Sequence, residues 1–147
     1  SDILRLGLVG CGGRGAGAAV NALSADANAR LVALGDLFPD MLKSARAALK
    51  AAKGEQVVVD DEHCFVGFDA YQNVIACSDV VLLALPTYFH PIYLKACVDA
   101  GKHVFCEKIH ALDAPGVKLV LAAGEIARQK GLSIVSGLAW RYHTGVR

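Results

Sequence analysis

The chain has 147 residues, enough for one domain with a substantial core, and 15 basic against 14 acidic side chains leave a formal net charge of +1. This balance, without a basic stripe or an RNA-binding signature, argues against nucleic acid as a partner. No apolar run approaches the roughly 18 residues of a membrane helix, so we expect no membrane partner. Hydrophobic residues make up 54% of the chain. This excess indicates a sheet covered on both faces, or a surface that meets another domain or subunit.

The five cysteines are an odd number and form no Cys-x-x-Cys pair. Scattered free thiols suit a reducing compartment, so we expect a cytoplasmic protein. Ser1 is not a natural start, and a periplasmic protein that has lost its signal sequence is the alternative. His63 and Cys64 are adjacent rather than at metal-ligand spacing, and we expect no metal site.

The first predicted unit is a strand at 3–9 followed by a helix over about 14–25. Gly10, Gly12 and Gly15 lie between them in the pattern Gly-x-Gly-x-x-Gly. The first glycine permits a tight turn off the strand, the second a close approach of the backbone to a diphosphate, and the third tight packing of helix on strand. The free N–H groups at the helix start favour an anion.

A second apolar strand at 30–35 ends in Asp36, 21 residues after Gly15. A carboxylate at this place can accept both hydroxyls of an adenosine ribose and would repel a 2′-phosphate, which favours NAD over NADP. The same residues also fit a glycine-rich turn followed by an aspartate that caps the next helix. A glycine-rich first loop is also conceivable in a methyltransferase.

The remaining predicted elements are a helix from Pro39 to about Lys53, a short strand at 56–59, an irregular segment at 60–68, a short helix over 69–76, a strand at 79–85, a helix from about 90 to 100, a strand at 103–107, a helix from about 114 to 130 and a strand at 132–136. This alternation predicts an α/β fold, a Rossmann-type doubly wound parallel sheet of about six strands in the order 3-2-1-4-5-6. The loops that begin at Gly10, Asp36, Pro86 and Lys108 should then converge on the ligand at the carboxyl ends of the strands.

Several stretches together resemble the NAD(P)-dependent oxidoreductases typified by glucose–fructose oxidoreductase and inositol dehydrogenase. They are Gly10–Gly15, Leu85-Pro86-Thr87 with His90, Ala100–Lys108, and Ala111-Leu112-Asp113. The resemblance spans nearly the whole chain but only the first domain of that family. It implies that residues 1–147 form the NAD(P)-binding domain and that the C-terminal substrate domain, which usually also carries the dimer contact, is absent from this chain.

The resemblance also implies the site residues. The cofactor would be bound by Gly10, Gly12, Gly13, Arg14, Gly15, Asp36, Leu85, Pro86, Thr87, His90, Glu107 and Lys108. Arg14 would lie near the adenosine side, and Leu85, Pro86 and Thr87 would line the nicotinamide half. Lys108 would be catalytic, because a lysine beside the substrate hydroxyl can stabilise a developing alkoxide and relay its proton. From the residues alone, Lys108 also fits a solvated lysine, and His90 fits a structural helix-start histidine. His110 and His143 have no implied role, and we expect them at the surface or between domains.

The function that follows is hydride transfer between a sugar or polyol secondary alcohol and a nicotinamide cofactor, with the substrate bound only when the missing domain is present. The alternatives are a nucleotide-binding module without catalysis and a domain of an NAD-dependent glycosidase. The chain departs from the family pattern at Ile109, where the family has proline. If that proline peptide is cis, isoleucine should relax the bond to trans and displace Lys108.

The helix over 114–130 has apolar residues on two sides. Val117, Val120, Leu121, Gly124 and Ala127 form one stripe, which we expect to face the sheet, and Leu119, Ala122, Ala123 and Ile126 form the other. Leu119 and Ile126 would then point away from the sheet, and a homo-oligomer could form through this helix.

Overall fold

The computed structural model describes residues 3–146. Its elements are β1 (Leu4–Val9), α1 (Gly13–Ala25), β2 (Ala29–Asp36), α2 (Pro39–Lys53), β3 (Cys64–Val66), α3 (Ala70–Cys77), β4 (Val80–Leu83), α4 (His90–Asp99), β5 (His103–Cys106), α5 (Ala114–Gln129) and β6 (Ile134–Ser136), with short 3₁₀ turns at 54–56, 87–89 and 139–142. All strands are parallel, in the order β3-β2-β1-β4-β5-β6. The predicted fold class and strand order are confirmed.

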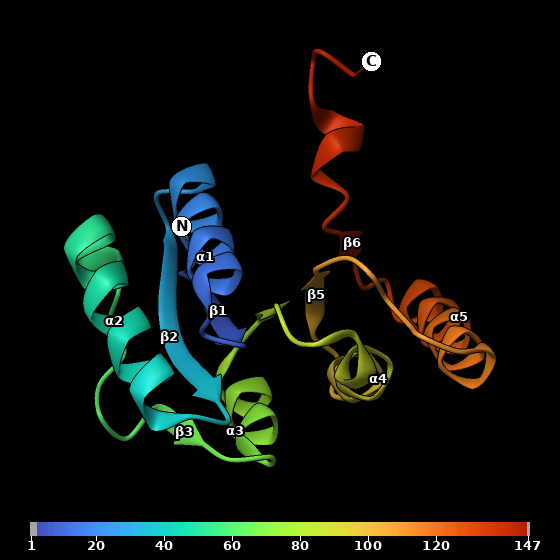
Figure 1. The fold of residues 1–147 in the computed structure, drawn as a ribbon, viewed down its shortest axis with the longest axis horizontal. Coiled ribbons are helices and arrows are strands. Elements are labelled where there is room, and N and C mark those ends of the chain that lie inside the picture. The colour runs from blue at the N-terminus through green and yellow to red at the C-terminus, as the bar shows by residue number, and fades with distance from the viewer. Residues whose placement is uncertain (1–2, 147) are drawn as a thin grey trace.

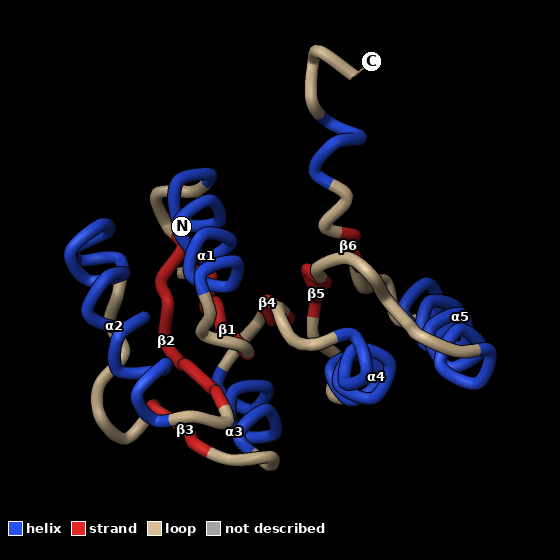
Figure 2. The backbone as a smooth tube through the Cα atoms, viewed as in Figure 1, coloured by secondary structure: helices blue, strands red, loops and turns tan. Residues whose placement is uncertain are grey.

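The helices cover the two faces of the sheet unequally. Figure 1 shows α1 and α2 on one side and α3, α4 and α5 on the other. Figure 2 shows the residues after β6 leading away from the sheet as a loop with one helical turn. None of the helices between residues 3 and 146 is long and apolar enough to cross a membrane.

Helix starts follow local signals in the sequence. Pro39 stands in the first turn of α2, where its missing N–H costs no hydrogen bond. Asp113 caps α5, because its carboxylate accepts a 2.7 Å hydrogen bond from the Gly116 N–H. These two signals explain why the predicted starts of α2 and α5 are correct.

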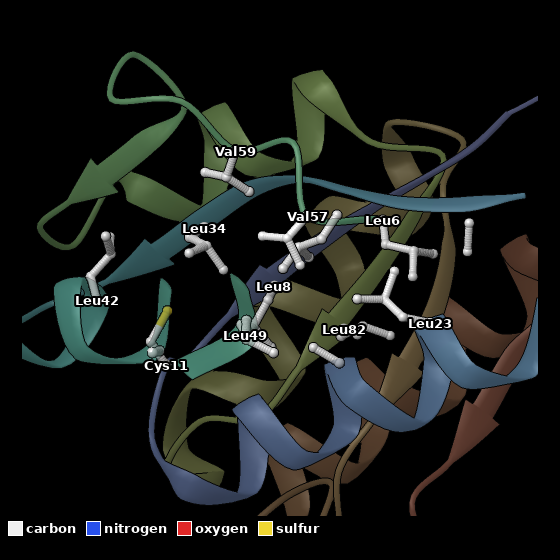
Figure 3. Close-up of a cluster of buried hydrophobic side chains, with 14 residues drawn as sticks. Leu6, Leu8, Cys11, Leu23, Leu34, Leu42, Leu49, Val57, Val59 and Leu82 are labelled. Carbon is white, nitrogen blue, oxygen red and sulfur yellow. The ribbon is translucent and has the colours of Figure 1, made fainter. Parts of the chain in front are cut away.

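One core lies between the sheet and the pair α1–α2. Leu8 and Leu34 of the sheet are fully buried, and they meet Leu23 of α1 and Leu49 of α2 there (Figure 3). The other core fills the space under α3, α4 and α5, with Val81 and Leu83 against Leu94 and Ala123. Burial of each large apolar side chain contributes about 1.5–3 kcal/mol, so these two layers hold the sheet between the helices.

The third strand is displaced from its predicted position. Val57 is buried and forms only an isolated bridge with Leu31, whereas the strand that pairs with β2 is β3, in the segment expected to be irregular. Val57 and Val59 do point into the first core (Figure 3). The prediction of a paired strand at 56–59 is therefore wrong: Val57 and Val59 are buried and Val58 is exposed, but the ladder with β2 forms at Cys64–Val66.

The α1 side of β5 and β6 has no helix over it among the described residues. A mainly apolar hollow of about 670 Å³ lies there, lined by α1, by residues of β1, β2, β4, β5 and β6, and by the segment after β6. Leu4, Leu6, Val80, Leu82 and Phe105 supply its walls. This face accounts for part of the high hydrophobic content of the chain.

The prediction of which side of α5 faces the sheet is wrong in part: Val120 and Ala127 lie against the second core as expected, but Val117 and Leu121 do not. Ala123 and Ala127 are buried, and Ile126 packs against the second core. Leu121 is 69% exposed and Val117 is 47% exposed. Apolar residues surround most of this helix, so periodicity alone could not set its rotation. Leu119 and Ile126 therefore do not form an outward surface, and self-association through this helix has no support from them.

The packing at Gly15 generates the first prediction. A Cβ built on Gly15 would overlap the carbonyl oxygen of Gly10, which is backbone and cannot rotate away, whereas one on Gly17 would meet only the Arg14 guanidinium at 3.5 Å. We expect Gly15→Ala to lower the free energy of unfolding by about 1–3 kcal/mol. Gly17→Ala, the matched control in α1, should be neutral or stabilising by up to about 1 kcal/mol. Urea unfolding measures both. Equal effects of the two substitutions would contradict the close approach at Gly15.

Candidate functional site

The glycine loop turns sharply at the end of β1. Gly10 has φ +95°, and a Cβ on it would overlap the carbonyl oxygen of Ala84 at the end of β4. The Gly10 N–H donates to the Gly35 carbonyl on β2 at 2.9 Å. The loop is thereby held between the ends of β2 and β4, at the point where the two halves of the sheet diverge. Open ligand-binding crevices of doubly wound sheets lie at this point.

Asp36 stands at the end of β2 beside that loop. Its Oδ2 accepts a 2.6 Å hydrogen bond from the Cys11 N–H, and its Oδ1 accepts one of 2.9 Å from the Phe38 N–H. Each carboxylate oxygen has capacity for a further donor. The carboxylate is therefore fixed in direction and can still receive hydroxyl groups.

Asp36 opens onto a hollow of about 280 Å³, which we call the Asp36 hollow. It is lined by Val9, Gly10, Gly12, Asp36, Leu37, Phe38, Met41, Gly67, Phe68, Ala70, Tyr71, Ala84, Leu85, Pro86, Phe89 and Tyr93. Five of the predicted site residues meet here: Gly10, Gly12, Asp36, Leu85 and Pro86. The loops after β1, β2 and β4 thus converge as the topology predicted.

Sequence reasoning missed the apolar wall of the Asp36 hollow. Phe38 is 57% exposed and Phe68 is 63% exposed, and Met41 lies beside them in the lining. Exposed aromatic and thioether groups around a polar carboxylate suit a flat apolar ring. The pair Leu37-Phe38 directly after Asp36 was the available signal, since an exposed apolar pair is unexpected in a strand-to-helix loop.

Three more of the predicted residues, Arg14, Glu107 and Lys108, line a second hollow of about 690 Å³, the Lys108 hollow. It is lined by Arg14, Glu107, Lys108, Gly137, Leu138, Ala139, Trp140, Arg141 and Val146. Lys108 is exposed there, and Glu107 is only 7% exposed. Gly13 is exposed at the start of α1, whereas Gly15 is buried and Thr87 is half-buried, and none of these three lines either hollow.

Arg14 lines the Lys108 hollow and forms an ion pair with Glu107. Its Nε donates to Glu107 Oε1 at 2.6 Å, and the Lys108 N–H donates to Glu107 Oε2 at 3.3 Å. A nearly buried carboxylate requires such partners, because its desolvation is otherwise costly. Arg14 does not line the Asp36 hollow, and its expected place near the adenosine side stays a prediction. Gly137 adds to the fit, since a Cβ there would come within 2.9 Å of the Glu107 carboxylate.

The Lys108–Ile109 peptide bond is cis, so the expected relaxation to trans is wrong. The Ile109 carbonyl oxygen lies 2.6 Å from His90 Nδ1. A carbonyl only accepts, so Nδ1 carries the proton and donates. This hydrogen bond fixes the loop that bears Lys108.

His90, the first residue of α4, is fully buried. Its Nε2 accepts a long, 3.3 Å hydrogen bond from the Leu85 N–H, while Nδ1 serves the Ile109 carbonyl. Burial lowers the pKa of this imidazole below its usual value, which favours the neutral form that both contacts require. The side chain therefore joins the loop after β4 to the loop after β5, and lines neither hollow. These contacts favour the interpretation of His90 as a structural histidine at a helix start, and direct contact of His90 with the cofactor stays a prediction.

The chain resembles known proteins over almost its entire length. A model of an oxidoreductase family with an NAD-binding Rossmann fold, GFO_IDH_MocA, matches residues 4–134. The inositol 2-dehydrogenase of Rhizobium meliloti is 36% identical over 118 residues, which cover 80% of this chain and 32% of that enzyme. The inositol 2-dehydrogenase of Agrobacterium fabrum is 32% identical over 144 residues, which cover 97% of this chain and 39% of that enzyme.

Among solved structures, scyllo-inositol dehydrogenase from Lactobacillus casei, with bound NAD(H) and scyllo-inositol, matches with a TM-score of 0.72 at 25% identity. That match covers 97% of this chain and 38% of the other. The chain thus spans 32–39% of the length of these relatives. On the family match and the geometry above, the chain belongs to the GFO_IDH_MocA oxidoreductase family and is an NAD-binding Rossmann domain.

Proposed function

We propose that this domain serves hydride transfer between a secondary alcohol of a sugar or polyol and the nicotinamide of NAD, as part of a longer protein. The observation that carries the proposal is that eight of the predicted residues line two hollows, Gly10, Gly12 and three others the Asp36 hollow, and Arg14, Glu107 and Lys108 the Lys108 hollow. A dinucleotide has an adenosine half and a nicotinamide half joined by a diphosphate, and each hollow would take one of them. The Asp36 hollow offers a ribose acceptor and apolar walls, and the Lys108 hollow offers an ionisable amine.

The residues present fit this cofactor. A Cβ on Gly12 would find its nearest neighbour, Met41 Cε, at 3.9 Å, and one on Gly13 would find nothing within 4 Å. The backbone is therefore open above the start of α1, where N–H groups and the helix dipole favour a diphosphate. Asp36 would hold the adenosine ribose, with Phe38 and Met41 beside the base, and Leu85 and Pro86 would direct the chain of the cofactor toward Lys108.

The bound nicotinamide supplies the hydride chemistry, and the protein supplies position and proton transfer. Lys108 would donate a hydrogen bond to the substrate hydroxyl, stabilise the charge that develops on its oxygen, and pass on its proton. Glu107 would not share that work, because both of its oxygens are engaged by Arg14 and by the Lys108 main chain. His90 would act as a positioning residue, through the Ile109 carbonyl.

The relatives are inositol 2-dehydrogenases, which supports a polyol as the substrate of the longer protein. The five cysteines are all free, which supports a cytoplasmic location. A binding module without chemistry and a domain of an NAD-dependent glycosidase remain the alternatives. The two tests below separate binding from turnover.

Asp36 should set cofactor choice. We expect the chain to bind NAD at least about tenfold more tightly than NADP, and Asp36→Ala to weaken NAD binding by about 10–100-fold through loss of a charge-assisted hydrogen bond. The same substitution should leave NADP binding unchanged or improved, because repulsion of the 2′-phosphate is removed. Calorimetric titration measures all four affinities.

Asp40→Ala is the matched control, since Asp40 is an exposed carboxylate in the first turn of α2. It removes the same charge close to Asp36 and should retain the preference for NAD. Equal affinity of the unmutated chain for the two cofactors would sink this assignment.

Turnover should require more than this chain. We expect the 147-residue chain with NAD and myo-inositol to form no NADH above background, because positioning of the substrate supplies much of the rate and Lys108 is open to solvent. The absorbance of NADH measures this, with the Rhizobium meliloti inositol 2-dehydrogenase as the active control. NADH formation at a rate comparable to that control would show that the chain holds substrate by itself.

A further inference from the structure

Three side chains with metal-ligand chemistry meet below the loop that carries Lys108. His90 begins α4, Cys106 ends β5, and His110 follows four residues later. One potential ligand atom from each lies within 4.8 Å of the other two. Cys106 and His110 bracket the segment Glu107–Ile109, so anything that joins them closes this loop. His63 and Cys64, the pair considered from the sequence, are not part of this group.

Each of the two imidazoles uses one ring nitrogen in a short hydrogen bond, which leaves His90 Nε2 and His110 Nδ1 as the candidate metal ligands. His90 Nδ1 donates to the Ile109 carbonyl, and His110 Nε2 lies 2.7 Å from the Ser136 hydroxyl. Metal-bound histidines commonly use their second nitrogen in this way, with a backbone carbonyl or another oxygen as partner. His90 Nε2 then has only the long contact with the Leu85 N–H.

The clearest sign of a missing partner is His110 Nδ1. It is buried without a hydrogen-bond partner, and is the one such side-chain nitrogen or oxygen found among the described residues. Buried polar atoms are rarely left in this state, and each case calls for a physical explanation. His110 was expected at the surface or between domains, and its side chain is half-buried and lies against Ser136.

We propose that His90, Cys106 and His110 form a binding site for a zinc-class divalent cation. Nitrogen and thiolate ligands of this kind select Zn²⁺ over Mg²⁺ or Ca²⁺, and three protein ligands leave a fourth position for water. In a tetrahedral site the ligand atoms stand about 3.3–3.6 Å apart, so the side chains would close inward by about 1 Å. Binding forms a Zn–S bond, and the thiol proton leaves to solvent. The cation would replace the long Leu85 contact at His90 Nε2.

The site differs in kind from the proposed cofactor site. His90, Cys106 and His110 line neither the Asp36 hollow nor the Lys108 hollow. The metal-coordinating side chains would therefore hold the Lys108 loop in place and would not face the bound cofactor. The cation would fasten the two ends of the Lys108 loop to the start of α4. Its place is therefore that of a structural clamp on the loop, and its presence can be tested without nucleotide or substrate.

Cobalt substitution tests the proposal. We expect Co²⁺ added to the reduced chain to bind at one equivalent, with a thiolate-to-cobalt charge-transfer band and the visible absorption of a tetrahedral site, both removed by Zn²⁺. Cys106→Ser should abolish the charge-transfer band, and His110→Ala should weaken binding at least tenfold. Cys64→Ser and His143→Ala are controls that remove a partly buried thiol and an exposed imidazole outside the site, and both should bind as the unmutated chain does.

Circular dichroism of each variant checks that it is folded. Cys106 is buried, so if Cys106→Ser does not fold, the half-buried His110→Ala decides the matter. Zn²⁺ should also raise the melting temperature of the unmutated chain and not that of His110→Ala. Absence of the charge-transfer band from the unmutated chain, its loss in Cys64→Ser, or undiminished cobalt affinity in His110→Ala would each overturn the proposal. None of these results bears on NAD binding, which Asp36→Ala tests separately.

Discussion

Two close contacts between backbone segments at the end of β1 determine how the glycine loop and α1 are placed on the sheet. Gly10 lies against the Ala84 carbonyl and Gly15 against the Gly10 carbonyl, with no room for a Cβ at either place. These contacts draw α1 down onto β1 and place the glycine loop between the ends of β2 and β4. Gly10 and Gly12 of this loop line the Asp36 hollow, and Arg14, at the start of α1, lines the Lys108 hollow.

Features that depend on local sequence could be predicted. Alternation of apolar strands with helices gave the parallel sheet and its order, and the spacing of the glycines from Asp36 identified the first hollow. The third strand was misplaced because Val57 and Val59 have the burial of a strand without its hydrogen-bond ladder. The polar residues around His63 concealed the short segment that does pair with β2. The spacing of apolar residues in the sequence indicates which side chains are buried, but it does not indicate which backbone segment forms hydrogen bonds with the neighbouring strand.

Features that depend on distant side chains could not be predicted. Arg14 and Glu107 are 93 positions apart, and only the folded sheet makes them neighbours. The rotation of α5 was ambiguous because apolar residues occupy most of its circumference, and its inward side combines Val120 and Ala127 with Ala123 and Ile126, one pair from each predicted stripe. The cluster of His90, Cys106 and His110 had no sequence spacing to suggest it, because α4 contributes one member and β5 and its loop the others.

The two hydrogen bonds on Asp36 have a consequence for the thermodynamics of binding. A free aspartate must give up rotamer freedom when it captures a ligand, and immobilising a side chain costs about 0.5–1.5 kcal/mol. The Cys11 and Phe38 N–H groups already hold both oxygens of Asp36 in the folded chain. The loss of side-chain entropy therefore occurs on folding and would not oppose the binding of a ribose. In the proposed cofactor site the carboxylate would therefore contribute most of its hydrogen-bond enthalpy to affinity, and the preference for NAD over NADP that we predict would depend on a group that cannot rotate away from a 2′-phosphate.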